Sequence, residues 1–173
     1  SARRDRDLRN LAETDKFPSM SSVEARLAEL GLTLPTPPAA AGAYVPAVRT
    51  GALLYLAGTL PMKDGKVVSL GKVGREVDLA QAAEAAQLCA LNALANAKAA
   101  LGSLDRVTRV VMVNGFVNGV DGFSDSPKVL NGASEFLLRV FGDAGRHARA
   151  AVSVNGLPLG VSVEVQIVLE VRD

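Results

Sequence analysis

Residues 146–166 read RHARAAVSVNGLPLGVSVEVQ and place an arginine and a glutamate on segments that otherwise have the composition of a sheet core. Arg149 lies close to the chain's one histidine, and Glu164 stands within a run of valines. A guanidinium binds a carboxylate through two parallel hydrogen bonds and does not lose its charge. A carboxylate can orient or deprotonate a water molecule. Arg149 and Glu164 could therefore bind a small carboxylate and activate water beside it.

The alternating pattern of this segment predicts a β-hairpin, because neighbouring side chains of a strand point to opposite faces. Two turns remain open, Asn155–Gly156 and Pro158–Gly160, so the register is not fixed. Arg149 and Glu164 are expected on one polar face, and the apolar face is expected to lie under helices. The predicted apolar face contains Ala148, Ala150, Val152 and Val154 on the first strand and Val161, Val163, Val165, Ile167, Leu169 and Val171 on the second.

The elements that must position this hairpin follow the order α, then ββ(β)αβαββ. Ser21 and Glu24 have the spacing of a capping box for a short helix that ends at Gly31. Residues 44–61 predict two strands with a turn at Thr50–Gly51, and residues 67–68 a short third strand. The later elements are a helix from Asp78, capped with Gln81, to Gly102, a strand within 106–119, and a helix with Ser126 as N-cap and Pro127 at its first position. Two long helices cover one side of such a sheet, so its polar face must meet water, a ligand or another subunit.

Composition excludes several classes of function. A net charge of +1 gives no general attraction to nucleic acid or membranes, and an aromatic content of 4% without Trp makes a base-stacking surface hard to build. One Cys and one His cannot form a soft-metal site within a chain, and no apolar run reaches the ~20 residues that span a bilayer. We therefore expect no metal, no nucleic-acid partner and no membrane partner.

The first 20 residues differ in kind from the rest. They are charged and aperiodic, which predicts a disordered extension or a cloning remnant for residues 1–20 and a single domain over residues 21–173. The arginines suggest a trimmed organelle-targeting peptide, but the acids among them disfavour it. A cytoplasmic location is the expectation.

The pattern ARAAV…LP…VEV resembles the C-terminal signature of the RidA/YjgF family, also called L-PSP or UK-type proteins. Tyr44 in GAYVPAVRTG is similar to the family's early Tyr, Gly58 in YLAGTLP to the Gly of its Ser-Gly-Gln segment, and Asn131 in VLNGASEF to the Asn that starts its second helix. The likeness covers residues 40–172. The N-terminal helix and GRHAR resemble a longer, less characterised branch.

The resemblance implies a chorismate-mutase-like fold of the bacillus type: an α+β domain with a mixed sheet, two long helices on one face and an extra N-terminal helix. It also implies a homotrimeric barrel with ligand clefts between subunits. Characterised members hydrolyse 2-imino and enamine acids, such as 2-aminoacrylate, to 2-keto acids and ammonia without a metal or organic cofactor. In these terms Arg149 would bind the substrate carboxylate and Glu164 the water. The other expected binding residues are Tyr44, Gly58, Asn131 and Ala151.

The sequence also departs from the family pattern. Ala57 stands where active deaminases usually have Ser, Thr59 replaces Gln, and Ala151 occupies a position that is Cys in some members. The alternative is therefore a non-catalytic trimer that binds small carboxylates. Ribonuclease activity or translation inhibition, an older label of the family, is disfavoured by the near-neutral charge.

Two further residues invite chemistry but are expected to be structural. His147 is taken to lie out of phase with Arg149, which favours a satisfied histidine over a catalytic one. Cys89 falls among Ala and Leu in the long helix, which predicts a buried and unreactive thiol.

Overall fold

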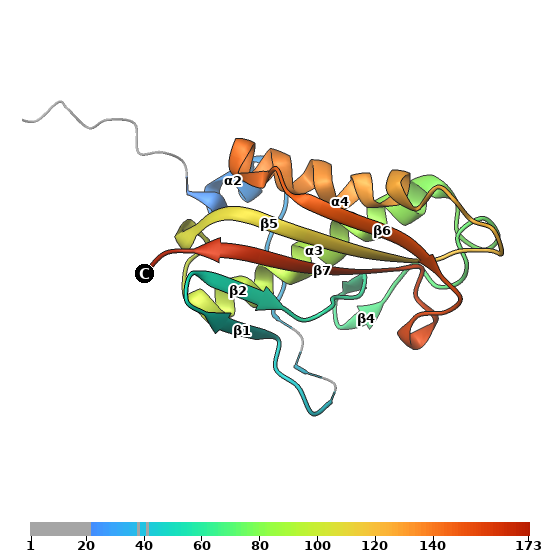
Figure 1. The fold of residues 1–173 in the computed structure, drawn as a ribbon, viewed down its shortest axis with the longest axis horizontal. Helices are drawn as coiled ribbons and strands as arrows, with labels where there is room; N and C mark the ends of the chain where they lie inside the picture. The colour runs from blue at the N-terminus through green and yellow to red at the C-terminus, as the bar shows by residue number, and fades with distance from the viewer. Residues whose placement is uncertain (1–21, 38, 41) are drawn as a thin grey trace, which may run out of the picture.

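Five strands form one mixed sheet, and two long helices cover one of its faces (Figure 1). The computed structural model of the chain describes residues 22–37, 39, 40 and 42–173, so the expectation for residues 1–20 lies outside the described residues. The predicted order of elements is confirmed over the described part, except that two short strands, β3 and β4, stand where one was predicted. The elements are α2 (Val23–Glu29), β1 (Ala47–Thr50), β2 (Leu53–Leu56), β3 (Met62–Lys63), β4 (Lys66–Val67), α3 (Leu79–Leu101), η1 (Leu104–Arg106), β5 (Val107–Asn118), α4 (Ser126–Phe141), η2 (Gly142–Gly145), β6 (Ala148–Val154), η3 (Pro158–Gly160) and β7 (Val163–Val171).

Helix α3 begins and ends where its sequence predicts. The side chain of Asp78 accepts from the backbone of Gln81 at 2.8 Å, and the side chain of Gln81 accepts from the backbone of Asp78 at 3.0 Å. Gly102 ends the helix at φ 83°, a backbone conformation that residues with a Cβ atom disfavour. The small residues of α3 let α4 approach closely, since an added Cβ at Gly132 would overlap the carbonyl oxygen of Ala83.

The starts of the other two α-helices differ from the prediction. Ser126 is the first helical residue of α4, and the N-cap is Asp125, which makes no side-chain capping bond. Ser126 is buried, and its hydroxyl has no hydrogen-bond partner among the described residues. Helix α2 is capped by Ser22, whose hydroxyl accepts from Ala25 at 3.2 Å, while the predicted cap Ser21 lies outside the described residues. Leu27, 1% exposed, docks α2 on the core.

The predicted hairpin of β6 and β7 is wrong, because β5 lies between these two strands. The strand order is β1-β2-β7-β5-β6, with β5 and β6 parallel and β5 and β7 antiparallel. Helix α4 connects β5 to β6, and such a crossover is what a parallel pair requires. Residues 155–162 then carry the chain past the end of β5, so β7 pairs on the other side. The sequence order strand, helix, strand already contained this signal.

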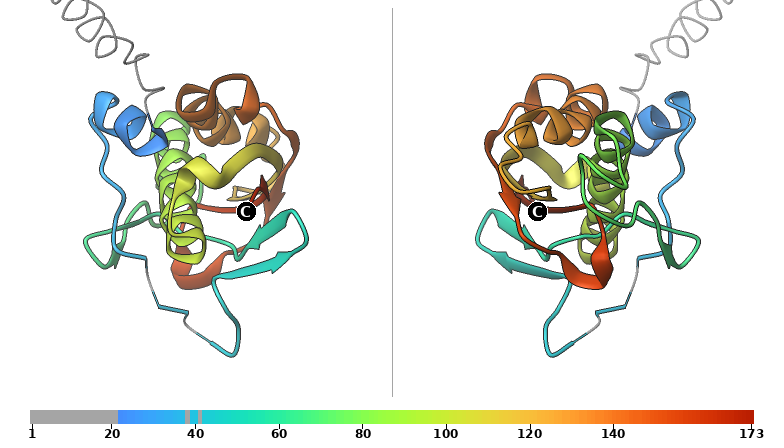
Figure 2. Two further views of the ribbon diagram at one scale, coloured as in Figure 1. Left: turned by 90° about the vertical axis from the view of Figure 1, so that its left-hand side faces the viewer. Right: turned by 90° about the vertical axis from the view of Figure 1, so that its right-hand side faces the viewer.

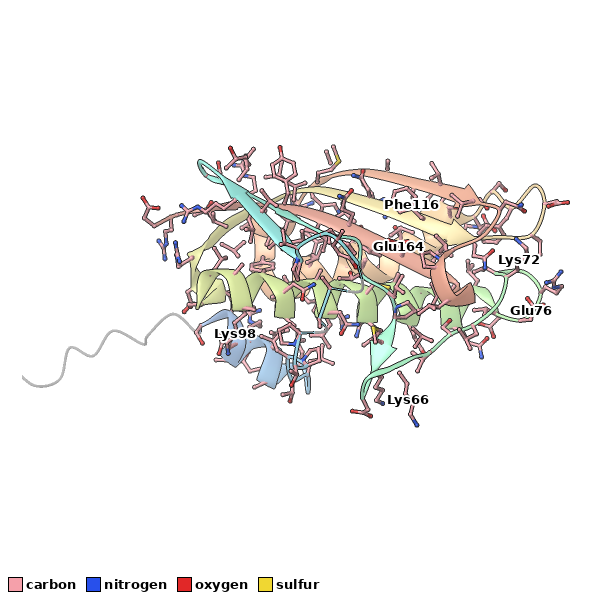
Figure 3. All side chains as sticks on the ribbon, turned by 90° about the horizontal axis from the view of Figure 1, so that it is seen from below. Lys66, Lys72, Glu76, Lys98, Phe116 and Glu164 are labelled. Carbon is pink, nitrogen blue, oxygen red and sulfur yellow. The ribbon has the colours of Figure 1, made fainter. Side chains whose placement is uncertain are left out.

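Lys72 forms hydrogen bonds at the end of the sheet where the chain passes from β6 to β7 around the end of β5 (Figure 3). The Nζ of Lys72 donates to the side-chain oxygen of Asn118 at 3.0 Å, to the carbonyl of Gly119 at 3.1 Å and to the carbonyl of Asn155 at 2.7 Å. Asn118 is the last residue of β5, and Asn155 follows β6. One ammonium therefore holds together the ends of the two parallel strands, and Asn155 is not the tight turn of a hairpin.

The sheet has one buried face and one face without a helix, as expected (Figure 2). The prediction that Ala148, Ala150 and Val152 lie on the buried face is wrong, because their pairing with β5 places them on the face without a helix. Val163, Val165, Ile167 and Leu169 of β7 are 0% exposed, and the alternate residues of this strand are half-buried on the other face. We call that other side of the sheet the open face. The hairpin of β1 and β2 is confirmed, with Gly51 at φ 56° in its turn. Strands β3 and β4 form a separate two-stranded sheet.

Cys89 lies in the core between α3 and β7, as predicted. Its side chain is 0% exposed, and its Sγ is 3.7 Å from the carbonyl oxygen of Val163. Burial raises the pKa of the thiol well above its usual value, and the nearby carboxylate of Glu164 raises it further. The reactive thiolate is therefore disfavoured, and access is closed.

We expect the native protein to react with a thiol reagent such as 5,5′-dithiobis(2-nitrobenzoate) only as fast as it opens or unfolds. The rate of release of the coloured thiolate, measured with and without denaturant, checks this. Cys89→Ser is expected to keep the ligand affinity, because the thiol contacts only the core. Rapid labelling of the folded protein with loss of affinity would contradict this interpretation.

Candidate functional site

Arg149 projects from the edge strand β6 toward helix α4. One of its terminal nitrogens, Nη1, donates to the Oδ1 of Asn131 at 2.9 Å and to the Oγ of Ser134 at 3.1 Å. Asn131 and Ser134 stand three residues apart on α4, so they lie on one face of the helix. The structure thus brings together Arg149 and Asn131, two of the predicted site residues.

A cavity of about 260 Å³ opens beside this arginine and is lined by Ser134, Leu138, Arg146, His147 and Arg149. Its charged side chains are both arginines, which suits an anionic ligand. A larger cavity of about 400 Å³ lies at the start of α3, but Glu76 and Glu84 line it. Carboxylates repel a carboxylate ligand, so the cavity beside Arg149 is the better candidate for one.

Glu164 does not share a face with Arg149, contrary to the prediction. Val113 of β5 pairs with Arg149 on one side and with the buried Ile167 on the other, so Arg149 belongs to the helix-covered face. Three residues further along β5, Phe116 pairs with Glu164, which places that carboxylate on the open face. Figure 3 shows Glu164 and Phe116 on neighbouring strands of the sheet. The prediction placed the two residues on one face because it paired β6 directly with β7. Each strand instead pairs with β5, and each has its own register on it.

Glu164 instead lies against Gly58. An added Cβ at Gly58 would overlap a carboxylate oxygen of Glu164, so a larger residue there would displace the Glu164 side chain from this position. The neighbouring Thr59 is held by two backbone hydrogen bonds to Val165, at 2.8 and 3.1 Å. The hydroxyl of Thr59 points inward and donates to the carbonyl of Cys89 at 2.8 Å. Gly58 and Glu164 therefore form a second pair of predicted site residues, on the other side of β5 from the first.

Burial raises the pKa of Glu164, because removal of water disfavours the ionised carboxylate. Its side chain is half-buried on the open face, opposite Phe116. A carboxyl group with a raised pKa can exchange a proton nearer to neutral pH than an ordinary glutamate. The environment of Glu164 is therefore suited to acid–base chemistry.

The two remaining predicted residues lie at opposite edges of the sheet. Ala151 is two residues after Arg149 on β6, pairs with Gly115 and packs on the core. Tyr44 is 54% exposed in the segment that precedes β1, and β1 is the edge strand farthest from β6. Within one chain, Arg149 and Ala151 therefore lie on the edge strand β6, Glu164 lies on the central strand β7, and Tyr44 precedes the opposite edge strand β1.

Sequence reasoning missed Ser134 and misplaced His147. The Nε2 of His147 lies 2.9 Å from the Oγ of Ser134, which also contacts Arg149. The expectation that His147 is out of phase with Arg149 is wrong, since residues two apart on an extended chain point to the same side. That spacing, with the helical spacing of Asn131 and Ser134, is the signal that could have found both residues.

Neither a metal-binding cluster nor a membrane-spanning helix is found in the described part of the chain. Residues 22–37, 39, 40 and 42–173 contain no group of three or more His, Cys, Asp or Glu side chains that could hold a metal ion. Within the same residues, no helix has both the length and the hydropathy needed to cross a membrane.

Comparison with known proteins identifies relatives over almost the whole described region. Residues 24–171 match the family described as "YjgF/chorismate_mutase-like, putative endoribonuclease". Protein TCP17 of Trypanosoma cruzi is 43% identical over 152 residues, which cover 87% of this chain and 95% of TCP17. The structure of protein Atu1372, "with unknown function", from Agrobacterium tumefaciens is 50% identical with a TM-score of 0.81, and the match covers 87% of this chain and 92% of that one.

A third relative has the name that the motifs predict. The structure of RidA from the Antarctic bacterium Psychrobacter sp. is 30% identical with a TM-score of 0.55, covering 79% of this chain and 94% of that one. The mixed sheet with its two helices is the chorismate-mutase-like fold of these structures. Because the family match spans residues 24–171, this chain belongs to the YjgF/chorismate mutase-like family, the RidA/YjgF family predicted from its motifs.

Proposed function

We propose that the protein binds small 2-oxo and 2-imino carboxylates in a cleft between subunits and hydrolyses the imino acids to 2-keto acids and ammonia. The observation that carries the proposal is the anchoring of Arg149. Both hydrogens of its Nη1 are used by Asn131 and Ser134. No described residue accepts a hydrogen bond from its Nε or Nη2. That edge of the guanidinium has the spacing of a carboxylate and is left to grip one.

The site requires a second subunit, because one chain separates its parts. Arg149 and Asn131 lie at the β6 edge on the helix-covered side, while Gly58 and Glu164 lie on the open face. In the proposed homotrimer the β6 edge of one subunit faces the Gly58–Glu164 pair of the next. A 2-imino acid whose carboxylate is bound by Arg149 then has its C=N carbon directed toward Glu164.

The open face supports this assembly through its exposed apolar side chains. Val48 is 54% exposed, Tyr55 44% and Val152 47%, and the register of the sheet places all three on this face. Aligned apolar side chains on one face are typical of an interface, whereas scattered ones are ordinary. A closed symmetric assembly would cover them and would bury the outer edge of β6.

The reaction then needs one water molecule. Glu164 accepts a proton from the water molecule while the water oxygen adds to the C=N carbon of the imino acid. Glu164 passes that proton to the nitrogen, which gives the neutral carbinolamine. It then takes the hydroxyl proton and delivers it to the nitrogen as the C–N bond breaks, so that ammonia leaves and the C=O of the keto acid remains. Arg149 holds the carboxylate throughout, and Gly58 leaves room for the Glu164 side chain to reach the reacting carbon.

A non-catalytic carboxylate binder is the second candidate, and the geometry at position 59 favours it. The hydroxyl of Thr59 is engaged with the carbonyl of Cys89, and Thr59 is buried, so this position offers the ligand no side chain. Ala57 offers none that is polar. Binding without turnover of 2-iminobutyrate would select this alternative.

The assembly itself is testable. We expect sedimentation equilibrium at micromolar concentration to give three times the chain mass of 18.0 kDa. Val152→Glu, which places a charge on the open face, is expected to dissociate the trimer. Val68→Glu, at the residue that directly follows β4 of the separate small sheet, is the matched control and is expected to leave it intact. A monomeric wild type would exclude the intersubunit site.

Arg149→Lys and Arg149→Ala are expected to weaken binding of 2-oxobutyrate and to abolish most turnover. A lysine ammonium cannot be anchored by α4 and grip a carboxylate through two points at once. The loss should be about 2–4 kcal/mol, or roughly 30- to 1,000-fold in affinity. Titration calorimetry measures it, with Arg139→Ala, elsewhere on α4, as the control. Wild-type affinity in Arg149→Ala would contradict the proposed role.

Glu164→Gln is expected to lower turnover of 2-iminobutyrate more than affinity for 2-oxobutyrate, because it removes a base and keeps the volume. Release of keto acid follows turnover, and Glu170→Gln, on the same strand and face, is the control. Equal turnover in Glu164→Gln would exclude Glu164 as the base.

The same substitution has an expected effect on stability. The pKa of Glu164 is raised by folding, so the native state binds its proton more tightly and stability falls as the pH rises from the unfolded toward the folded pKa. Glutamine removes that penalty. The variant should gain stability over wild type at pH 7, and the difference should vanish below about pH 4, under the unfolded pKa. Denaturant unfolding at both pH values checks the sign.

A further inference from the structure

A chain of hydrogen bonds runs from Arg149 through Ser134 and His147 to a backbone carbonyl. The Nδ1 of His147 lies 2.6 Å from the carbonyl oxygen of Gly145, and its Nε2 lies 2.9 Å from the Oγ of Ser134. The same Oγ accepts from the Nη1 of Arg149 at 3.1 Å. Arg149 of β6, Ser134 of α4 and His147 just before β6 therefore form one continuous network beside the candidate cavity.

The donor and acceptor in each hydrogen bond follow from the group at the end of this hydrogen-bond chain, the carbonyl of Gly145. The carbonyl of Gly145 can only accept, so the Nδ1 of His147 carries a hydrogen. The Nε2 of the neutral ring is then an acceptor, and Ser134 must donate its hydroxyl hydrogen to it. This leaves the lone pairs of the Ser134 oxygen for the Arg149 guanidinium. All three bonds run the same way, and such chains polarise one another.

The end of this chain is fixed by close packing of the backbone. Gly145 is buried, and an added Cβ there would overlap the carbonyl oxygen of Leu137 on α4. The short turn η2 is therefore pressed against the same helix that carries Ser134 and Asn131. The carbonyl that sets the tautomer of His147 has little freedom to move.

We propose that His147 and Ser134 are positioning residues that hold the Arg149 guanidinium in the orientation that grips a carboxylate. The inference rests on the proposed function, because Arg149 is the ligand-binding group. Asn131 takes one hydrogen of Nη1 and Ser134 takes the other, so the plane of the guanidinium is set by two contacts. Without His147, the Ser134 hydroxyl is free to rotate and to turn its hydrogen toward the arginine.

The first test is spectroscopic and uses the fact that the chain has one histidine. Long-range ¹H–¹⁵N spectra of the full chain report the tautomer of this single ring without assignment. We expect the Nδ1–H form with an acceptor Nε2 in the wild type, and a shifted Nε2 signal in Ser134→Ala. The Nε2–H form in the wild type would overturn the proposal.

The second test measures affinity for 2-oxobutyrate by calorimetry. His147→Ala and Ser134→Ala should each weaken binding roughly three- to tenfold, the worth of one hydrogen bond. The double variant should bind no worse than the weaker single variant, because the chain is already broken. Ser134→Thr should restore binding because it keeps the hydroxyl. Ser103→Ala, which removes the hydroxyl that caps η1, is the matched control.

Losses that add in the double variant, or wild-type affinity in His147→Ala, would overturn the positioning role. A wild type that binds no 2-oxo acid would instead overturn the proposed function. The ¹⁵N signals of the arginine side chains then decide the positioning proposal alone. Slow rotation of the Arg149 guanidinium in the wild type, lost in His147→Ala, would support it, and equal rotation in both would refute it.

Discussion

The pairing of β5 with β6 on one side and β7 on the other is the constraint on which the site depends. Side chains of directly paired residues lie on the same face, so the partners of β5 fix the faces of Arg149 and Glu164 independently. The two partners are Val113 and Phe116, three residues apart, and an odd separation puts them on opposite faces. No rotamer of either side chain can undo that, because the sheet lies between them. The proposed site therefore takes its cation and its carboxylate from different chains.

This constraint also explains the division of polar contacts around the sheet. On the helix-covered side, the charge of Arg149 is tolerated at an edge strand, where α4 supplies Asn131 and Ser134 as acceptors. On the open face, Glu164 lies opposite Phe116 and against Gly58 with its pKa raised by burial. Each pair is thus built by a close approach within one chain. Arg149 is held by hydrogen bonds, while burial raises the pKa of Glu164.

The sequence predicted the helices and strands better than it predicted which strands pair with one another. The capping box of Asp78 and Gln81 and the turn at Gly51 are local signals, and the structure contains both. The partner of β6 is a long-range choice, and alternation within one strand has no information about it. The resemblance named six candidate site residues, and their roles in binding stay predictions. It could not say that Arg149 meets Asn131 while Glu164 meets Gly58, since that depends on pairing.

Ser134 and His147 show why the missed residues matter to the chemistry. An arginine on an edge strand has many rotamers, and holding a ligand requires that one of them prevails, at a cost in side-chain entropy. Asn131 alone fixes one hydrogen of Nη1 and leaves the guanidinium free to swing about it. Ser134 fixes the second only if its own hydrogen points elsewhere, and His147 takes that hydrogen because the Gly145 carbonyl has already set its tautomer. The packing of η2 on α4 is therefore transmitted through these hydrogen bonds to Arg149, the proposed ligand-binding group.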